Sequence, residues 1–410
     1  MASQNPLDLG SGGYSIPLPT TQPIPYLITA FLLVVLVYNI GDNGTKLPEI
    51  NPLKPFEFTN RRRMGEFIET SKELMLRGRA VFGSNLYKMT SPWGEVVVLP
   101  PELMHEVRND PKLDLMEPDA HGYVPGFDPF KGSPNTTRVI NKYLTKSLAL
   151  QPHLDKRESI KSAALARGET GVIFDDSIEW FKAEAKTKYD PAIAQISLSL
   201  VAIHTTSDLL QQCMIDLASN PELFEPLREE VIRVFSTEGF TKTALYNLKL
   251  MDSVFKETQR IKPVLLSTWR RTVQKDIKLS TGFILRKGQK VIATNTHMWD
   301  SNYHENPLVY NGYRFFNMHN TEEEKQAHLV STSARHPAFG HGHHACPGRF
   351  FATHELKVAM AHMLLKYEWK LPDGANPQPI PYSMTFLPDP TTKLLIRRRK
   401  EEIDLDSLEF

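Results

Sequence analysis

The segment Phe339-Gly340-His341-Gly342-His343-His344-Ala345-Cys346-Pro347-Gly348-Arg349-Phe350 decides how the chain is interpreted. Cys346 ends a glycine-rich loop, and Pro347-Gly348 opens a predicted helix over 347–366, because proline fits the first helical turn, where its missing N–H is not needed. A thiolate just before a helix N-terminus is stabilised by the helix dipole and by free backbone N–H groups. The glycines let the backbone approach a bulky group closely. A thiolate held in this way can ligate iron and push electron density onto it.

The same segment is rich in histidine, so a zinc site is the main alternative. Zinc sites that contain cysteine usually show paired short spacings, such as C-x-x-C or H-x-x-x-H. Here Cys346 stands alone, and His343 and His344 are adjacent, so their side chains do not easily converge on one ion. The spacing therefore favours a lone cysteine ligand. On this interpretation the histidines are ordinary loop residues.

The composition excludes several classes of protein. The 410 residues include 48 Lys+Arg against 47 Asp+Glu, and this balance argues against a nucleic-acid binder, which is usually strongly basic. A hydrophobic content of 41% is too low for a polytopic membrane protein and too high for a disordered chain. The two cysteines, Cys213 and Cys346, cannot form a disulfide framework. The length allows two or three domains, or one large α-rich domain.

The first 60 residues are predicted to lie outside the globular domain. Residues 1–23 form a flexible tail with a single charged residue, and residues 24–40 are an uncharged run of about the length of a spanning helix. No basic residue precedes Lys46 and no Ala-x-Ala site follows the run, which argues against a signal peptide. The positive-inside rule then predicts a single-pass transmembrane anchor with the rest of the chain in the cytosol; a buried core helix is the alternative. Residues 41–60 form a proline-rich linker.

Residues 61–410 are predicted to form a single mainly α domain with small β-sheets. Apolar spacing indicates helices at 67–79, 141–150, 153–166, 192–219, 221–236, 248–261 and 347–366. Strands are expected at 86–90 and 95–99, joined by a turn at 91–94, and a hairpin is expected over 384–397.

The pattern Phe339-x-x-Gly342-x-His344-x-Cys346-x-Gly348 resembles the haem-binding loop of the cytochrome P450 family. The resemblance implies a haem-thiolate fold in which Cys346 is the axial ligand of the iron of haem b. The family usually has an arginine where His344 stands, and that arginine pairs with a haem propionate. His344 could donate a hydrogen bond instead, although its charge would depend on pH.

Two further sites follow in the family's order. In the helix over 248–261, the i, i+3 spacing of Glu257 and Arg260 puts them on one face. Such a pair usually lies on the solvated surface. In the family the pair is buried and contacts a second arginine, and Arg314 resembles that second arginine. Because a guanidinium can fork onto a carboxylate, Glu257, Arg260 and Arg314 would form a structural lock that serves folding and haem retention. Downstream of Glu257, Arg270 or Arg271 would bind a propionate, or either is a surface charge.

The long helix over 192–219 carries His204-Thr205-Thr206 where the family has an acid–alcohol pair that relays protons. The pair resembles His204-Thr205, and an alternative register makes Thr206 the alcohol. From the residues alone, mid-helix threonines can also bond back to the carbonyl four residues earlier and merely bend the helix.

The resemblance covers roughly residues 60–150 and 190–400, and the chain is short by roughly a hundred residues near 150. The missing part would form most of the lid over the substrate, and an open haem face admits water. The resemblance implies a monooxygenase that inserts oxygen into a C–H bond, with electrons from NADPH through a cytochrome P450 reductase in the endoplasmic reticulum membrane. Its closest style is that of fungal members that oxidise terpenoids or meroterpenoids. The alternatives are a truncated haem-binding remnant without turnover and a protein without haem.

Overall fold

The computed structural model describes residues 23–40, 47–115, 159–160, 163–164, 166–168, 176–188 and 190–408. The chain divides into two units, residues 1–46 and 47–410, each described by itself. In the first unit, helix α1 (Pro23–Ile40) coincides with the uncharged run, and its residues 25–33 are exposed. Its role as a membrane anchor stays a prediction.

In the second unit, a five-stranded sheet is packed on both faces. The strand order is β1 (Tyr87–Ser91), β2 (Gly94–Leu99), β7 (Lys290–Ala293), β4 (Trp269–Val273) and β3 (Leu113–Leu115), and only the β2–β7 pair is parallel. Successive strand residues point to opposite faces. Val96 and Val98 therefore join the core under helix α2 (Arg61–Phe82), whereas Val97 and Leu99 join the core on the other face. Both predicted strands and the turn between them are confirmed.

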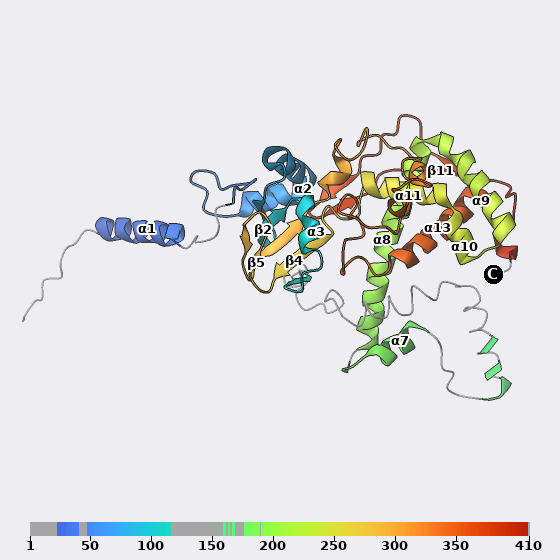
Figure 1. The fold of residues 1–410 in the computed structure, drawn as a ribbon, viewed down its shortest axis with the longest axis horizontal. Helices are drawn as coiled ribbons and strands as arrows, with labels where there is room; N and C mark the ends of the chain where they lie inside the picture. The colour runs from blue at the N-terminus through green and yellow to red at the C-terminus, as the bar shows by residue number, and fades with distance from the viewer. Residues whose placement is uncertain are drawn as a thin grey trace, which may run out of the picture. The chain divides into compact units, whose positions relative to one another are not determined.

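Helices build the largest hydrophobic core, and they lie together in Figure 1. They are α8 (Pro191–Ser219), α9 (Phe224–Glu238), α10 (Lys242–Asn247), α11 (Lys249–Ile261) and α13 (Arg349–Lys366). Four of the predicted helices correspond to α8, α9, α11 and α13, and a fifth lies within α2. Eleven of the thirteen residues of α11 are buried, so its polar side chains need partners inside the protein.

Shorter elements complete the second unit. The helices are α3 (Met104–Val107), α7 (Ser177–Glu184) and α12 (Glu324–Ala327). Three two-stranded sheets pair β5 (Ile277–Lys278) with β6 (Ile284–Leu285), β8 (Tyr367–Lys370) with β11 (Leu395–Arg398), and β9 (Ile380–Tyr382) with β10 (Thr385–Leu387). The helix predicted at 141–150, most of that at 153–166, and the join near 150 lie outside the described residues.

The predicted hairpin over 384–397 is wrong. β10 pairs with β9 before it, and β11 pairs with β8, which follows α13. The physical reason lies in Pro388 and Pro390, which cannot donate to a strand ladder. Between them, the Asp389 carboxylate accepts hydrogen bonds from the backbone N–H groups of Gln378 and Thr391, which fixes a turn there.

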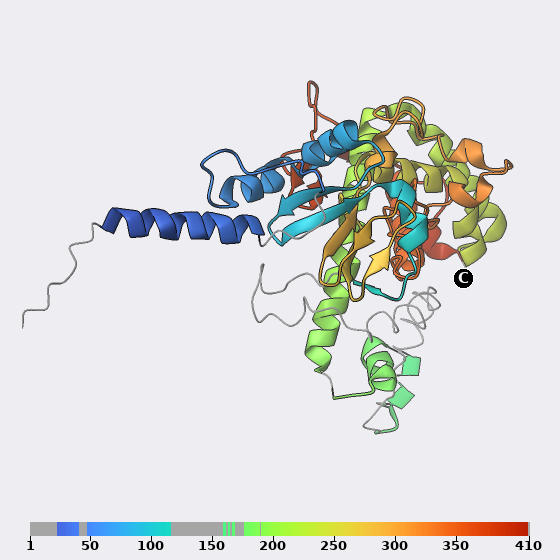
Figure 2. The ribbon, with the colours of Figure 1, turned by 60° about the vertical axis from the view of Figure 1, so that its left-hand side comes forward.

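Helix α8 changes character along its length. Among the described residues, the stretch Ile193–Ser219 is the one that is long and apolar enough to cross a membrane. In its C-terminal half, Leu209, Cys213 and Leu217 are buried in the largest core. Near its N-terminal end, Ile196 and Ile203 are 49% and 56% exposed. Figure 2 shows this end projecting beyond the other packed helices of the core.

Candidate functional site

Residues 339–348 form a tight loop that leads into α13. Gly340 and Gly342 have φ angles of +77° and +85°, a left-handed conformation that glycine adopts at no steric cost. The Cys346 N–H donates to the Phe339 carbonyl oxygen at 2.7 Å, which closes the loop. Gly348 then takes the N-cap position of α13, so Cys346 lies two residues before the N-cap.

Side chains from the residues after α3 hold this loop from outside. The Asn109 Oδ1 atom accepts the His343 N–H at 2.8 Å, and the Arg108 guanidinium donates to His341 Nε2 at 2.7 Å. A Cβ atom on Gly342 would lie 2.5 Å from Asn109 Oδ1, so the close approach as well as the φ angle requires glycine. Burial and the charge of Arg108 lower the pKa of His341 to about 4, which keeps this imidazole neutral.

The surroundings of Cys346 act on its thiol in two directions. Burial raises the pKa of the Cys346 thiol above its ordinary value, while the backbone N–H groups of Gly348 and Arg349 and the Arg349 charge act to lower it. The helix start therefore provides the donors that stabilise a thiolate, and burial opposes them. A coordinated metal cation shifts this balance, because it deprotonates a thiol that binds it.

Cys346 lines a cavity between the loop and α8. Its empty volume is about 820 Å³, part of it open to solvent, within the range of about 300–1,000 Å³ for ligand pockets. Helix α8 contributes Thr205 and Thr206, and the loop contributes His344 together with Cys346. The remaining lining is mostly apolar: Leu209, Gln259, Val264, Leu265, Thr268, Ala338, Phe339, Gly340, Ala352 and Leu356. The cavity therefore offers one sulfur donor inside walls that suit a hydrophobic group.

Both threonines of α8 bond back to their own helix. Thr205 is exposed, and its hydroxyl donates to the Val201 carbonyl oxygen at 3.0 Å. Thr206 is buried, and its hydroxyl contacts the carbonyl oxygens of Ala202 and Ile203. The structure thus brings both predicted relay alcohols to the cavity that contains Cys346, in the back-bonded state that bends helices.

His204 lies elsewhere on the same helix. Its side chain is exposed, and it is not among the described residues that line the cavity. Adjacent helical residues are turned by about 100° from each other, and of His204, Thr205 and Thr206 the two threonines are the ones that line the cavity. The structure therefore does not place the predicted partner of the alcohol beside it.

The two arginines of β4 differ in burial. Arg271 is 2% exposed, lies 4.8 Å from the Trp269 ring centroid, and donates from Nη1 to the Arg270 carbonyl oxygen at 2.8 Å. Burial lowers the pKa of Arg271 to about 10. Burial and then the charge of Arg271 lower the pKa of His344. Arg270 is half-buried, and neither arginine belongs to the described cavity lining.

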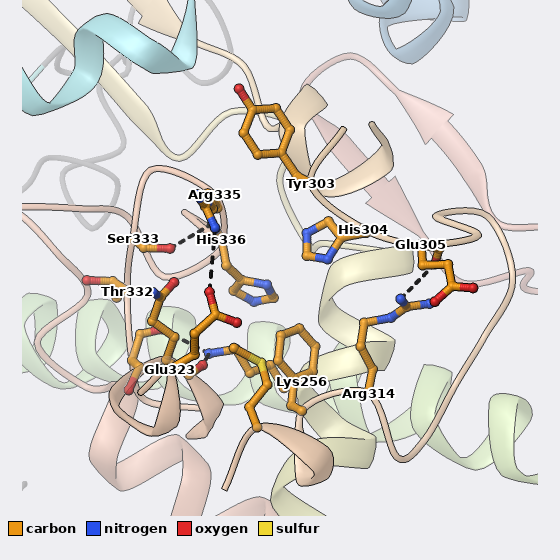
Figure 3. A pocket seen from close by; sticks show the side chains of 14 residues that line it. Lys256, Tyr303, His304, Glu305, Arg314, Glu323, Thr332, Ser333, Arg335 and His336 are labelled. Carbon is orange, nitrogen blue, oxygen red and sulfur yellow. Dashed lines mark hydrogen bonds and ion pairs between the residues drawn. The ribbon is translucent and has the colours of Figure 1, made fainter. Parts of the chain in front are cut away.

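The structure brings Glu257, Arg260 and Arg314 together. Arg260 forks onto the carboxylate with two hydrogen bonds of 2.8 Å, and both residues of this pair are completely buried. Arg314 Nε lies 3.1 Å from both carboxylate oxygens, and the Asn311 N–H donates to one of them. Figure 3 shows Arg314 at the edge of a second cavity, where it donates to the Glu305 carbonyl oxygen. The described partners saturate this buried carboxylate, as a buried charge requires.

Comparison with known proteins decides the family. The family profile described as Cytochrome P450 matches residues 187–396. Cytochrome P450 monooxygenase eqxH of Fusarium heterosporum is 38% identical, and the alignment covers 93% of this chain and 96% of that protein.

The chain belongs to the cytochrome P450 family. Cytochrome P450 monooxygenase hepE of Aspergillus oryzae is 32% identical over 91% of this chain and 89% of its own length. The solved haem domain of a cytochrome P450DA mutant is 15% identical, has a TM-score of 0.62, and is matched over 98% of its length and 86% of this chain, which shows the fold. The chain is therefore a cytochrome P450 monooxygenase by class.

The alignment with eqxH also measures the size difference. It runs over 495 positions, 85 more than the 410 residues of this cytochrome P450. At least that many aligned positions therefore have no residue of this chain opposite them. The match nevertheless extends over most of both proteins.

The family uses haem held by a cysteine thiolate, and the cavity lining fits that group. Cys346 provides a soft sulfur ligand, to which backbone N–H groups are directed at the start of α13. His344 provides a hydrogen-bond donor for an anionic group at one side of the lining. The apolar walls suit the body of a porphyrin.

Several residues that shape the site were not found from the sequence. Arg108 and Asn109 precede the loop they hold by more than two hundred residues, and no local pattern marks them. No local pattern marks Lys262 either. It directly follows α11 and forms an ion pair with Asp208 of α8, which links the end of α11 to α8. Such contacts depend on the fold rather than on spacing along the chain.

Proposed function

We propose that this cytochrome P450 holds haem b through Cys346 and inserts oxygen into a C–H bond of a hydrophobic secondary metabolite, of terpenoid or meroterpenoid type. The observation that carries the proposal is that Cys346, Thr205 and Thr206 line one mostly apolar cavity. When bound, haem supplies dioxygen activation and oxygen transfer. The terpenoid class is supported by the fungal style of the sequence, and the fungal relatives eqxH and hepE support the monooxygenase class.

Several residues of the loop are proposed to hold the haem. The Cys346 thiolate ligates the iron, with Gly348 and Arg349 donating backbone hydrogen bonds to sulfur. Phe339 closes the loop through its carbonyl, and Gly342 allows the loop to pack against Asn109. We assign propionate binding to His344 together with Arg271, and we prefer Arg271 to Arg270 because Arg271 is the arginine whose charge acts on His344.

Proton delivery is assigned to the hydroxyls of α8. A proton relay needs an alcohol that both donates and accepts within the cavity. Thr205 is exposed and makes one backbone bond, so its hydroxyl can turn toward a ligand or a water molecule at little cost. Thr206 is buried and contacts two carbonyl oxygens, so it is the less mobile alternative. His204 can take part only through solvent, because it does not line the cavity.

The organisation of the chain supports a membrane-bound enzyme. We propose a flexible tail at 1–23, an anchor at 24–40, a linker at 41–60 and a catalytic domain at 61–410. The anchor is assigned to α1 rather than α8, because the C-terminal half of α8 is buried in the core. The basic residues that follow α1 support a domain on the cytosolic side of the endoplasmic reticulum, where we propose that a reductase delivers electrons from NADPH.

A second candidate is a shortened haem-binding protein without turnover. Two observations favour it: at least 85 positions of the eqxH alignment are unmatched, and apolar residues of α8 such as Ile196 and Val201 are about half exposed. We infer that the lost segment belonged to the lid over the substrate. An open cavity admits water and weakens the orientation of a substrate.

The absorption spectrum of the reduced, carbon-monoxide-bound protein tests the haem assignment. A thiolate-type band is expected in the wild type, and Cys346→Ala is expected to lose haem altogether because no other sulfur lines the described cavity. A variant that keeps the thiolate-type band contradicts the assignment. Product formation from candidate terpenoids with NADPH and reductase then separates the enzyme from the remnant, since the remnant consumes NADPH without hydroxylated product.

A further inference from the structure

Three side chains with metal-binding atoms converge beside α11. His319 follows a short 3-10 turn at Phe316–Met318, Glu324 begins α12, and His328 follows α12 directly. One nitrogen or oxygen atom from each lies within 4.8 Å of the other two. None of the three belongs to the described lining of the Cys346 cavity.

His319 is the least satisfied member of this group. Its side chain is buried, and neither ring nitrogen has a hydrogen-bond partner. A buried polar group normally finds a partner, so such an imidazole calls for an explanation. Its Nδ1 atom lies 3.5 Å from Glu324 Oε1. Two ligand atoms on one tetrahedral zinc ion, each about 2.0–2.2 Å from it, are about 3.3–3.5 Å apart. The pair thus already has the separation of two zinc ligands.

His328 is held in place by contacts that leave it facing His319. The two imidazole rings pack edge to face with centroids 5.1 Å apart. The Tyr246 hydroxyl lies 3.2 Å from His328 Nε2, a contact of the kind that orients metal-binding histidines. Lys256 of α11 donates to the carbonyl oxygens of Gln326 and His328 at 2.7 and 2.6 Å.

Lys256 therefore fixes the end of the segment that carries His328. Figure 3 shows Lys256 at the second cavity, whose lining includes Met318 and Glu323, each directly before a candidate ligand in the chain. A backbone fixed by a buried side chain gives ligands a defined geometry before a metal arrives.

We propose that His319, Glu324 and His328 form a binding site for a divalent transition-metal ion, zinc in particular, separate from the Cys346 cavity. Two imidazoles and one carboxylate are a known ligand set of zinc sites that have three protein ligands and a water in the fourth position. Imidazole ligands also select against calcium and magnesium, which prefer oxygen. The ion would cross-link the two ends of the segment 319–328 beside α11.

Equilibrium dialysis of the chelator-treated full chain against zinc chloride tests the proposal, with zinc counted per protein and Co²⁺ absorption reporting tetrahedral geometry. One equivalent of zinc is expected. His319→Ala and His328→Ala are each expected to weaken binding at least tenfold, and Glu324→Gln is expected to weaken it less. Glu324 is 43% exposed, so Glu324→Gln leaves the core intact if a histidine variant fails to fold.

His343→Ala is the matched control, because it removes an exposed histidine from the other histidine-rich segment. Zinc uptake unchanged by His343→Ala and lost in the His319→Ala, His328→Ala double variant supports the site. Uptake that survives the double variant, that is lost in His343→Ala, or that does not occur in the wild type overturns it. Tetrahedral Co²⁺ bands that depend on His319 exclude adventitious surface binding.

Discussion

The substitution Glu257→Gln tests whether the buried lock stabilises the fold. The Glu257 carboxylate accepts two hydrogen bonds of 2.8 Å from Arg260, two of 3.1 Å from Arg314, and one from the Asn311 N–H. Glutamine keeps one carbonyl oxygen and turns an NH2 group toward guanidinium donors. Arg260 is completely buried, so its charge would lose its counter-charge without gaining water.

The expected loss follows from this burial. Removing one partner of a buried ion pair costs about 3–5 kcal/mol, because the remaining charge stays desolvated. A loss of that size raises the unfolded fraction roughly a hundredfold to several thousandfold, at about 1.4 kcal/mol per factor of ten. Urea unfolding followed by tryptophan fluorescence measures it as a lower midpoint. The haem content per protein, measured separately, reports whether the lock also retains the cofactor.

The chain contains a matched control for this experiment. Glu225 and Arg228 of α9 have the same i, i+3 spacing, but their charged atoms are 3.7 Å apart and the Glu225 side chain is 73% exposed. Exposed pairs contribute about 0–1 kcal/mol, so Glu225→Gln is expected to leave the unfolding midpoint almost unchanged. Equal losses in Glu257→Gln and Glu225→Gln would refute the reasoning, because burial would then not set the energy of the pair.

Two further predictions concern α8. Thr205→Ala is expected to divert more NADPH into peroxide and less into product than Thr206→Ala, because the exposed Thr205 hydroxyl is the freer of the two; the reverse ranking would assign the relay to Thr206. Burial raises the pKa of the Asp216 carboxyl from 3.8 to about 6, so the folded state holds a proton that the unfolded chain releases, and stability falls as pH rises between these values. Asp216→Asn should remove this loss, with a gain of up to about 3 kcal/mol in urea unfolding at pH 7.5 and almost none at pH 4. An equal gain at both pH values would show that burial does not perturb this carboxyl.

The part of the site that could be predicted from sequence is the part whose geometry is local. The loop around Cys346 specifies its own turns through Gly340 and Gly342, and Pro347 marks the helix that follows. The long helix α8 was likewise evident from its unbroken apolar pattern up to Asn220-Pro221. In each case neighbouring residues fix the backbone, so a short stretch of sequence contains the necessary information.

The remainder depends on contacts between distant segments. The i, i+3 spacing of Glu257 and Arg260 indicates a shared face, but only the packing of α11 inside the core makes that face buried. The predicted hairpin over 384–397 is wrong for a similar reason. Instead of pairing with each other, β10 pairs with β9 and β11 pairs with β8, and both partners precede residue 384. His204 was assigned to the relay by its position beside Thr205; its side chain is exposed and outside the described cavity lining, so its role stays a prediction.

Helix α8 lines the Cys346 cavity and also has exposed apolar side chains. The helix presents Thr205 and Thr206 to the Cys346 cavity, yet Ile203, two residues before Thr205, is 56% exposed. Ile196 and Val201 of the same helix are also about half exposed, which supports the proposal that relatives such as eqxH cover this stretch with a segment that this chain lacks. The described residues contain the whole loop around Cys346 and the whole Glu257 cluster, whereas we propose that the eqxH positions without a counterpart in this chain belong to the substrate side. We therefore expect this protein to retain haem binding more fully than it retains control over the reactivity of the haem.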